Sequence, residues 1–213
     1  GVAAIISTFP SAAPWKMHMI VAVIAILTYG NLRGVKEAGK AFAMPTYFFV
    51  GCMLIVFGMG FWRLANGTLP VLATDLPGAI EVGQEQGLLT AAAIFILLRA
   101  FANGGSSLTG LEAISDGVAL FKAPEHVNAK RTLVIMSCIL GTLVLGVSWF
   151  ASHVHAVPYE SGFPTVISQV AKAAVGEGAF GGVMFLLVQL ATMLILFAGA
   201  NTTYSAFPLL CNF

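Results

Sequence analysis

The stretch "ANGGSSLTGLEAISDG", residues 102–117, interrupts a long apolar segment with glycines, hydroxyl side chains and two carboxylates. The apolar segments on either side, 88–101 and 111–121, are each too short to cross a bilayer, which takes about 20 residues. Joined through residues 102–110, they are long enough for one tilted span with an unwound middle. Non-helical backbone is tolerated at membrane depth only where it is buried in protein or lines a wet cavity. The stretch therefore predicts two half-helices that face a ligand.

The composition indicates an all-α integral membrane protein. The chain is 58% hydrophobic and only 9% charged, whereas soluble domains carry about 25% charged residues. The net charge of +1 and the lack of a Lys/Arg run argue against a nucleic-acid partner. The Cys and His residues lack metal-ligand spacing, and no sequence resembling HExxH or GxSxG is present. We therefore predict no enzyme activity, no cofactor and no resident metal, with the lipid bilayer and a small ion or solute as partners.

Charged residues mark the ends of most predicted spans, which form a single transmembrane domain over residues 1–213. Basic residues cluster in the loops at 33–40 and 122–131, which the positive-inside rule places in the cytoplasm. The loops at 64–87 and 153–177 are then expected outside. Both ends of the chain resemble interrupted elements, so we expect an interior fragment of a longer, transporter-sized protein. The predicted spans are 1–9, 17–32, 41–62, 88–121 (broken at 102–110), 132–152 and 179–200.

The predicted break has the chemistry of a cation site. A half-helix that ends at the break leaves carbonyl groups with partial negative charge, and Ser106, Ser107 and Thr109 add hydroxyl oxygens. Glu112 follows Thr109 within one helical turn, so both side chains can face one cavity. An ionisable residue within a span is costly and usually functional. A carboxylate for which a proton and a cation compete is a minimal device for coupled transport.

Structural roles for these residues are also open at this stage. Glu112 could form an ion pair with Arg99 across the break. Asp116 lies nearer the expected cytoplasmic end, where a polar contact or gate fits better than direct substrate binding. The glycines at 104, 105 and 110 could serve close helix packing. A channel is a further class, but the chain lacks a filter sequence resembling TVGYG.

Four motifs resemble one transporter family in their order along the chain. They are "NLRGVKEAGKAFAMPTYFF" (31–49), "SSLTGLEAISDGV" (106–118), "EHVNAKRTL" (125–133) and "GANTTYSAFPLL" (199–210). Together they resemble the amino acid–polyamine–organocation (APC) superfamily, and within it the KimA-type potassium–proton symporters. The resemblance implies a LeuT-type inverted-repeat fold, with the fragment running from about the end of helix three to helix eight. The interrupted span would then be the broken sixth helix.

The resemblance also implies roles for individual residues. The Thr and Glu of the "TGxE" motif would contribute to the ion site, and they correspond to Thr109 and Glu112, with Ser106 and Ser107 nearby. Asp116 and Arg99 are candidates for a gate or coupling role. The implied activity is secondary active, proton-coupled potassium uptake by a multi-pass protein of the plasma membrane, with K⁺ and H⁺ as transported ions. The oligomeric state is open, with a homodimer as one option.

An amino acid permease is the alternative within the same superfamily. Amino-acid-transporting relatives typically have an aromatic-rich "FFAFxGF(D/E)" pattern where this chain has "ANGGSSLTGLE". Small hydroxyl-bearing walls suit an ion better than an amino acid side chain. Backbone N–H groups could still hold an amino acid carboxylate, so both substrates remain candidates from the sequence.

Overall fold

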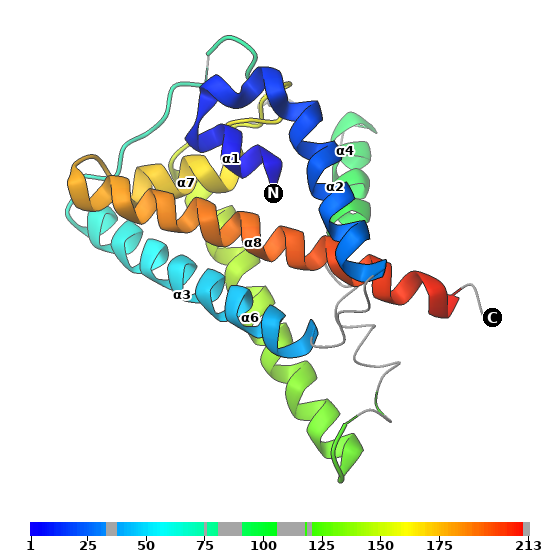
Figure 1. The fold of residues 1–213 in the computed structure, drawn as a ribbon. Helices are drawn as coiled ribbons and strands as arrows, with labels where there is room; N and C mark the ends of the chain where they lie inside the picture. Colours follow the sequence, from blue (N-terminus) through cyan, green and yellow to red (C-terminus); the bar gives the residue numbers. More distant parts are fainter. Residues whose placement is uncertain (33–37, 75, 81–90, 106–117, 119–120, 211–213) are drawn as a thin grey trace. The chain divides into compact units, whose positions relative to one another are not determined.

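The computed structural model describes residues 1–32, 38–74, 76–80, 91–105, 118 and 121–210, and the side chains of 38–42, 91–92 and 202–210 are not described. The described chain is helical, with one isolated antiparallel bridge between Ala79 and Tyr159. Gly1–Glu81 with Gly146–Phe213 forms one compact unit and Val82–Leu145 another, and each is considered by itself. The helices are α1 (Val2–Thr8), the 3₁₀ helix η1 (Pro10–Trp15), α2 (Lys16–Leu32), α3 (Ala38–Ala65), α4 (Ala91–Gly105), α6 (Glu125–His153), α7 (Val166–Val175) and α8 (Ala179–Leu210) (Figure 1).

Four helical stretches of the described chain are long and apolar enough to cross a membrane. A 23-residue helix reaches about 34 Å, slightly more than the roughly 30 Å hydrocarbon core. The composition-based prediction of an all-α chain with membrane-capable helices is therefore confirmed for the described residues. The stretches are Pro10–Leu32, Ala43–Ala65, Glu125–His153 and Ala179–Asn201.

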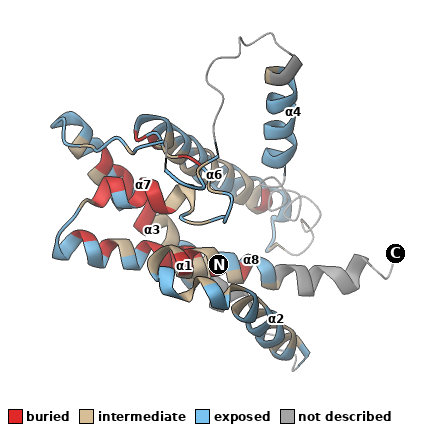
Figure 2. Ribbon diagram, turned by 90° about the horizontal axis from the view of Figure 1, so that it is seen from above, coloured by how far each residue is buried: buried red, intermediate tan, exposed pale blue. Residues whose placement is uncertain are grey.

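Helix α8 is the centre of the first unit, because α1, α3 and α7 all pack against it (Figure 1). Met184, Val188 and Ala191 lie one helical turn apart and are buried along α8. On α1, Ile6 is completely buried. Helix α7 is buried over most of its length, which Figure 2 shows. Short apolar elements thus fill the space beside the long helix, where they exclude water and lipid.

Helices α3 and α6 meet through a reciprocal contact of aromatic rings and glycines. A Cβ placed on Gly146 would lie 2.5 Å from the Phe57 ring, and one on Gly60 would lie 2.5 Å from the Phe150 ring. The two phenylalanine rings stack with centroids 5.7 Å apart. Each ring therefore occupies the space left by a missing side chain on the opposite helix, the small-residue packing that membrane helices favour.

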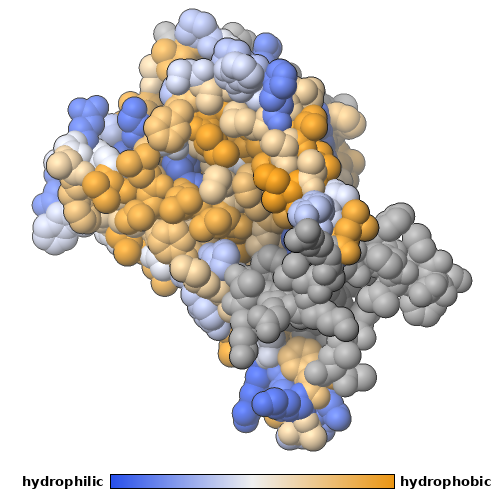
Figure 3. Space-filling view, in the orientation of Figure 1, coloured by the Kyte–Doolittle hydropathy of each residue, from blue (hydrophilic) through white to orange (hydrophobic). Residues whose placement is uncertain are grey.

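The outer faces of the long helices are strongly apolar. None of the 18-residue window that qualifies the Pro10–Leu32 stretch as a span is buried, and large hydrophobic side chains such as Ile26 and Leu54 are exposed. Figure 3 shows that such residues cover much of the visible surface over α3 and α8. In water this surface would be an aggregation hazard, whereas lipid is a suitable solvent for it.

Helix α7 corrects the expectation that residues 153–177 form a loop. Seven of its residues are buried, which is unusual for an outer connection (Figure 2). Its N-cap Thr165 accepts a hydrogen bond from the Ser168 N–H, and it ends at Gly176, whose φ of +74° favours glycine. At 10 residues, α7 is too short to be recognised by a search for membrane spans.

Helix α4 covers the first part of the interrupted segment. It runs from Ala91 to Gly105, so positions 102–105 of the predicted interruption are helical. The rest of that interruption and the second half-helix fall almost entirely outside the described residues. The LeuT-type repeat stays a prediction from the sequence.

Candidate functional site

Most of the predicted ion-site residues lie outside the described part of the chain. These are Ser106, Ser107, Thr109, Glu112 and Asp116. Arg99 is described, is exposed on α4 and forms no ion pair with a described residue. Its predicted alternative partner, Glu112, is outside the described chain. The ion site therefore remains a prediction from the sequence.

A buried polar network in the first unit joins α1, α7 and α8. The Thr165 N–H donates to Ser7 Oγ at 3.3 Å, and the Thr165 and Ser168 hydroxyls are hydrogen-bonded at 2.7 Å. Gln189 Nε2 donates to Ser168 Oγ at 2.6 Å. Gln189 Oε1 is buried and accepts no hydrogen bond from a described residue. The network fixes the start of α7 against its two neighbouring helices.

Gln169 connects α7 to the segment that follows α6. Its Nε2 donates to the carbonyls of Val157 (2.7 Å) and Pro164 (3.2 Å), while its Oε1 accepts from the Val157 N–H at 3.2 Å. Gln169 is only 8% exposed. An amide can satisfy a backbone donor and a backbone acceptor at once. The Gln169 side chain therefore pairs backbone N–H and C=O groups that have no helix or sheet partner in this irregular segment.

The segments that follow α3 and α6 pair with each other through their backbones. Leu72 N–H donates to the Val154 carbonyl at 2.9 Å, and Ile80 N–H donates to the Pro158 carbonyl at 2.9 Å. Glu160 N–H donates to the Gly78 carbonyl at 3.0 Å. These bonds surround the Ala79–Tyr159 bridge. The segments after α3 and α6, both of which positive-inside counting places outside, therefore pair with each other. We call the paired residues, 72–80 and 154–160, the layer.

Lys16 joins this layer to the start of α2. Its ammonium group donates to the Ser161 carbonyl at 2.9 Å and lies 5.5 Å from the centroid of the Phe163 ring. The carbonyl oxygen accepts a hydrogen bond from the ammonium group, and the aromatic face attracts its positive charge. Lys16 therefore has a structural role in the layer.

A cavity of 770 Å³ lies beneath the layer, within the first unit. Among the described residues, its polar lining consists mainly of hydroxyls, the Gln169 amide and the Lys172 ammonium group. Lys172 forms no ion pair with a described residue. The described part of the lining therefore offers hydrogen-bonding groups and one positive charge. It is lined by Ser7, Thr8, Pro10, Leu72, Ala73, Leu76, Pro77, Tyr159, Ser161, Phe163, Pro164, Ser168, Gln169, Lys172 and Phe185.

The polar residues of this region were missed in the sequence because they are spread over four separate segments. The only local signal is "PTVISQ" (164–169), in which a capping Thr precedes Ser and Gln at the spacing of one helical turn. That pattern predicts a helix start. It gives no indication of the partners on α1 and α8, which lie far away in the sequence.

Helices α2 and α8 meet through two amides. Asn31 Nδ2 donates to Asn201 Oδ1 at 2.6 Å and to the Leu27 carbonyl at 2.8 Å. Interhelical hydrogen bonds of this kind hold helices together in lipid, each by roughly 1 kcal/mol.

Among the described residues, no cluster of His, Cys, Asp and Glu side chains could hold a metal ion.

Together, these features define a helical membrane protein with polar side chains buried between its helices. No protein-family model matches the chain. It is 34% identical over 209 residues to the potassium transporter KimA of Bacillus subtilis (strain 168), a match that covers 98% of the chain. The chain spans 32% of the length of that curated relative. The relative is a transport protein, which agrees with the prediction that the chain is not an enzyme.

Proposed function

We propose that this chain belongs to a secondary active transporter that takes up potassium together with protons. The observation that carries the proposal is the 34% identity to the potassium transporter KimA over nearly the whole chain. The membrane-capable helices support it, because a transporter must enclose its path within spanning elements. APC superfamily membership, the LeuT-type fold and a place in the plasma membrane are parts of the same proposal.

In this proposal the ion is held at the predicted break by Thr109 and Glu112, with Ser106 and Ser107 nearby. Oxygen ligands suit alkali cations, and the Glu112 carboxylate can exchange a cation for a proton. Asp116 and Arg99 are assigned to gating or coupling. Arg99 is exposed on α4 and forms no ion pair with a described residue, so in this proposal its partner is one of the predicted site residues outside the described chain.

The amino acid permease remains the alternative substrate class, but the comparison with KimA does not favour it. The small residues of "ANGGSSLTGLE" support the same choice. An amino acid uptake screen is therefore the second experiment rather than the first.

The direct test is rubidium uptake, as a potassium tracer, by the full-length protein in bacteria that lack their own potassium uptake systems. We expect saturable uptake, with Glu112→Gln reducing the initial rate at least tenfold. Glu125→Gln is the matched control, because Glu125 is exposed at the start of α6, and it should transport normally. Membrane levels of all variants are measured in parallel. No uptake by well-inserted wild-type protein would contradict the proposal.

Proton coupling needs a separate measurement in liposomes that contain the purified full-length protein. An imposed inward proton gradient should accelerate rubidium uptake, and an uncoupler should abolish the acceleration. Saturable uptake that does not respond to the proton gradient would support potassium transport and contradict proton coupling.

A further inference from the structure

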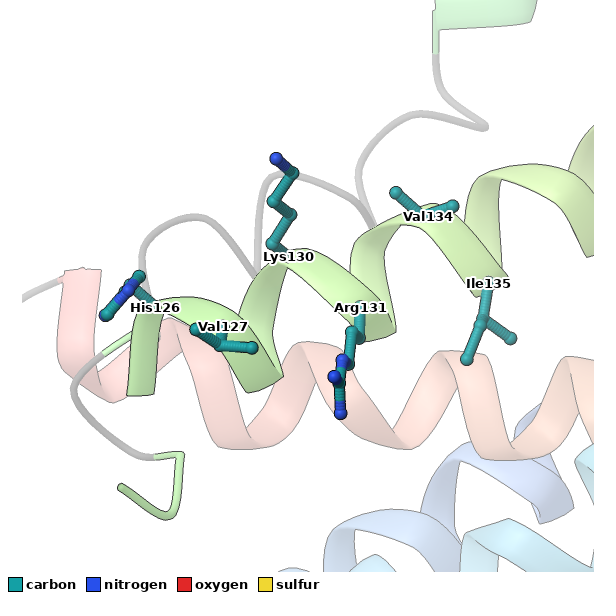
Figure 4. Close-up of a pocket in the computed structure, with 6 residues that line it drawn as sticks. All are labelled: His126, Val127, Lys130, Arg131, Val134 and Ile135. Carbon is teal, nitrogen blue, oxygen red and sulfur yellow. The ribbon is translucent and has the colours of Figure 1, made fainter. Parts of the chain in front are cut away.

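The cavity beneath the layer is lined by several separate segments of the first unit. Its described lining comes from α1, the start of η1, the segments after α3 and α6, and the helices α7 and α8. Its volume of 770 Å³ lies within the range of about 300–1,000 Å³ that small-molecule sites occupy. The depression along the first turns of α6 differs, because one helix supplies its described lining and Lys130 and Arg131 leave opposite sides of that helix (Figure 4). The cavity beneath the layer is therefore the better candidate for a ligand site.

Most polar groups of this lining already form hydrogen bonds within the chain. The hydroxyls of Ser7, Thr8 and Ser161 donate to backbone carbonyls at 2.8, 3.0 and 2.7 Å. Ser168 and Gln169 are bonded to neighbouring side-chain and backbone groups. A ligand would have to break these bonds in order to use the same protons.

Two lining side chains have polar hydrogens without an acceptor among the described residues. Tyr159 Oη and Lys172 Nζ line the cavity and form no hydrogen bond with a described residue. The phenol has one O–H bond, and the ammonium group has three N–H bonds and a positive charge. The described lining therefore has spare donors, and the group that a charged donor binds best is an anionic oxygen.

The rest of the described lining is largely apolar and partly aromatic. The rings of Tyr159, Phe163 and Phe185 all contribute to it, together with Leu72 and Leu76. Phe163 and Phe185 are only partly buried, so contact with an apolar ligand would remove further ring surface from water. Aromatic side chains pack well against aromatic partners in offset or edge-on arrangements. A ligand that matches both parts of the lining has an anionic oxygen group and an aromatic body.

We propose that the cavity beneath the layer binds a small aromatic carboxylate. The carboxylate accepts hydrogen bonds from Lys172 and Tyr159, and the aromatic body packs against Phe163 and Phe185. An inorganic anion would match only the donors, and a neutral aromatic molecule would match only the rings. Positive-inside counting places the connections that carry these residues outside, so the ligand enters from the external side. The proposal does not depend on potassium transport, because binding is measured directly.

The test is isothermal titration calorimetry of the purified full-length protein with 2-naphthylacetate. We expect saturable binding, whereas 2-naphthylethanol, which lacks the charge, and acetate, which lacks the rings, should each bind at least about tenfold more weakly. Lys172→Gln and Tyr159→Phe should each weaken naphthylacetate binding about tenfold, because a hydrogen bond to a charged group is lost. Lys172→Arg keeps the charge and should retain most of the affinity. Lys130→Gln is the charge-matched control, because Lys130 does not line this cavity, and it should bind like the wild type.

Asp75 lies outside the described residues but between two lining residues in the sequence, Ala73 and Leu76, so Asp75→Asn is measured as well. Binding by this variant but not by the wild type would show that the charge of Lys172 is already neutralised, and it would overturn the proposal. Equal affinity for naphthylethanol would show a neutral aromatic site, and equal affinity for acetate would show a simple anion site. Unchanged affinity in Lys172→Gln, or equal weakening in Lys130→Gln, would also contradict the proposal. Melting curves of each variant establish that it is folded.

Discussion

Among single residues, Gln169 and Gln189 allow the value of a buried amide to be measured. Both are buried, but Gln169 makes three hydrogen bonds to backbone groups whereas Gln189 makes one and leaves its Oε1 unpaired among the described residues. Gln169→Leu should lower the free energy of unfolding by about 2–4 kcal/mol, because buried backbone groups lose their partners. Gln189→Leu should cost less than about 1 kcal/mol, because it also removes an unsatisfied oxygen.

Thermal unfolding of the purified full-length protein, followed by tryptophan fluorescence, checks this order. The two variants have the same change in side-chain size and differ in the bonds that they remove. Equal melting temperatures for the two variants would show that Gln169 does not hold the layer that covers the cavity.

At the scale of elements, the α3–α6 contact depends on the missing side chains of its glycines. Gly146→Ala should destabilise the protein by about 1–3 kcal/mol, since the new methyl group would overlap the Phe57 ring. Gly58→Ala is the control, because nothing lies within 4 Å of a Cβ at that position. It should be neutral or stabilising by up to about 1 kcal/mol, the helix preference of alanine over glycine.

The measurement is the fraction of protein that remains monodisperse after heating, by size-exclusion chromatography. Phe57→Leu should partly restore the Gly146→Ala variant, because a smaller side chain makes room for the methyl group. A loss in Gly58→Ala equal to that in Gly146→Ala would contradict the packing explanation.

For the whole molecule, the basic loops predict one orientation in the membrane. Thr68→Cys and Ser161→Cys, in a background with the native cysteines replaced by serine, should react with an impermeant maleimide in intact cells. Glu125→Cys should react only after the cells are opened, because positive-inside counting places it in the cytoplasm. All three positions are exposed on the chain, so a failure to react reports the membrane rather than burial.

Labelling of Glu125→Cys in intact cells, with protection of the other two positions, would show that the orientation in the membrane is the reverse of the predicted one. Labelling of all three would contradict the number of spans between them. Either result is independent of the ion that the protein transports.

Helix existence could be predicted from the chain because it depends on local composition. Residues 41–62, 132–152 and 179–200 are continuous stretches without a charged residue, and each lies within a long helix of the structure. Helix α7 escaped prediction because it is short and its burial depends on α3 and α8. The predicted ion site rests on the hydroxyl and carboxylate groups of "SSLTGLE". Among its candidate residues only Arg99 is described, so the site stays a prediction.

Composition and charge spacing were sufficient to predict an all-α chain and its membrane-capable helices, whereas the motif with cation chemistry stays a prediction. Only the folded chain could show that Phe57 fills the space above Gly146, or that Thr165, Ser168 and Gln189 meet Ser7 in one network. The physical reason is the distance along the sequence between the groups that interact. Transfer of an apolar segment into lipid is a sum over its own residues, and so it can be read locally. Packing and hydrogen-bond satisfaction depend on groups that are distant in the sequence and become neighbours only when the helices assemble.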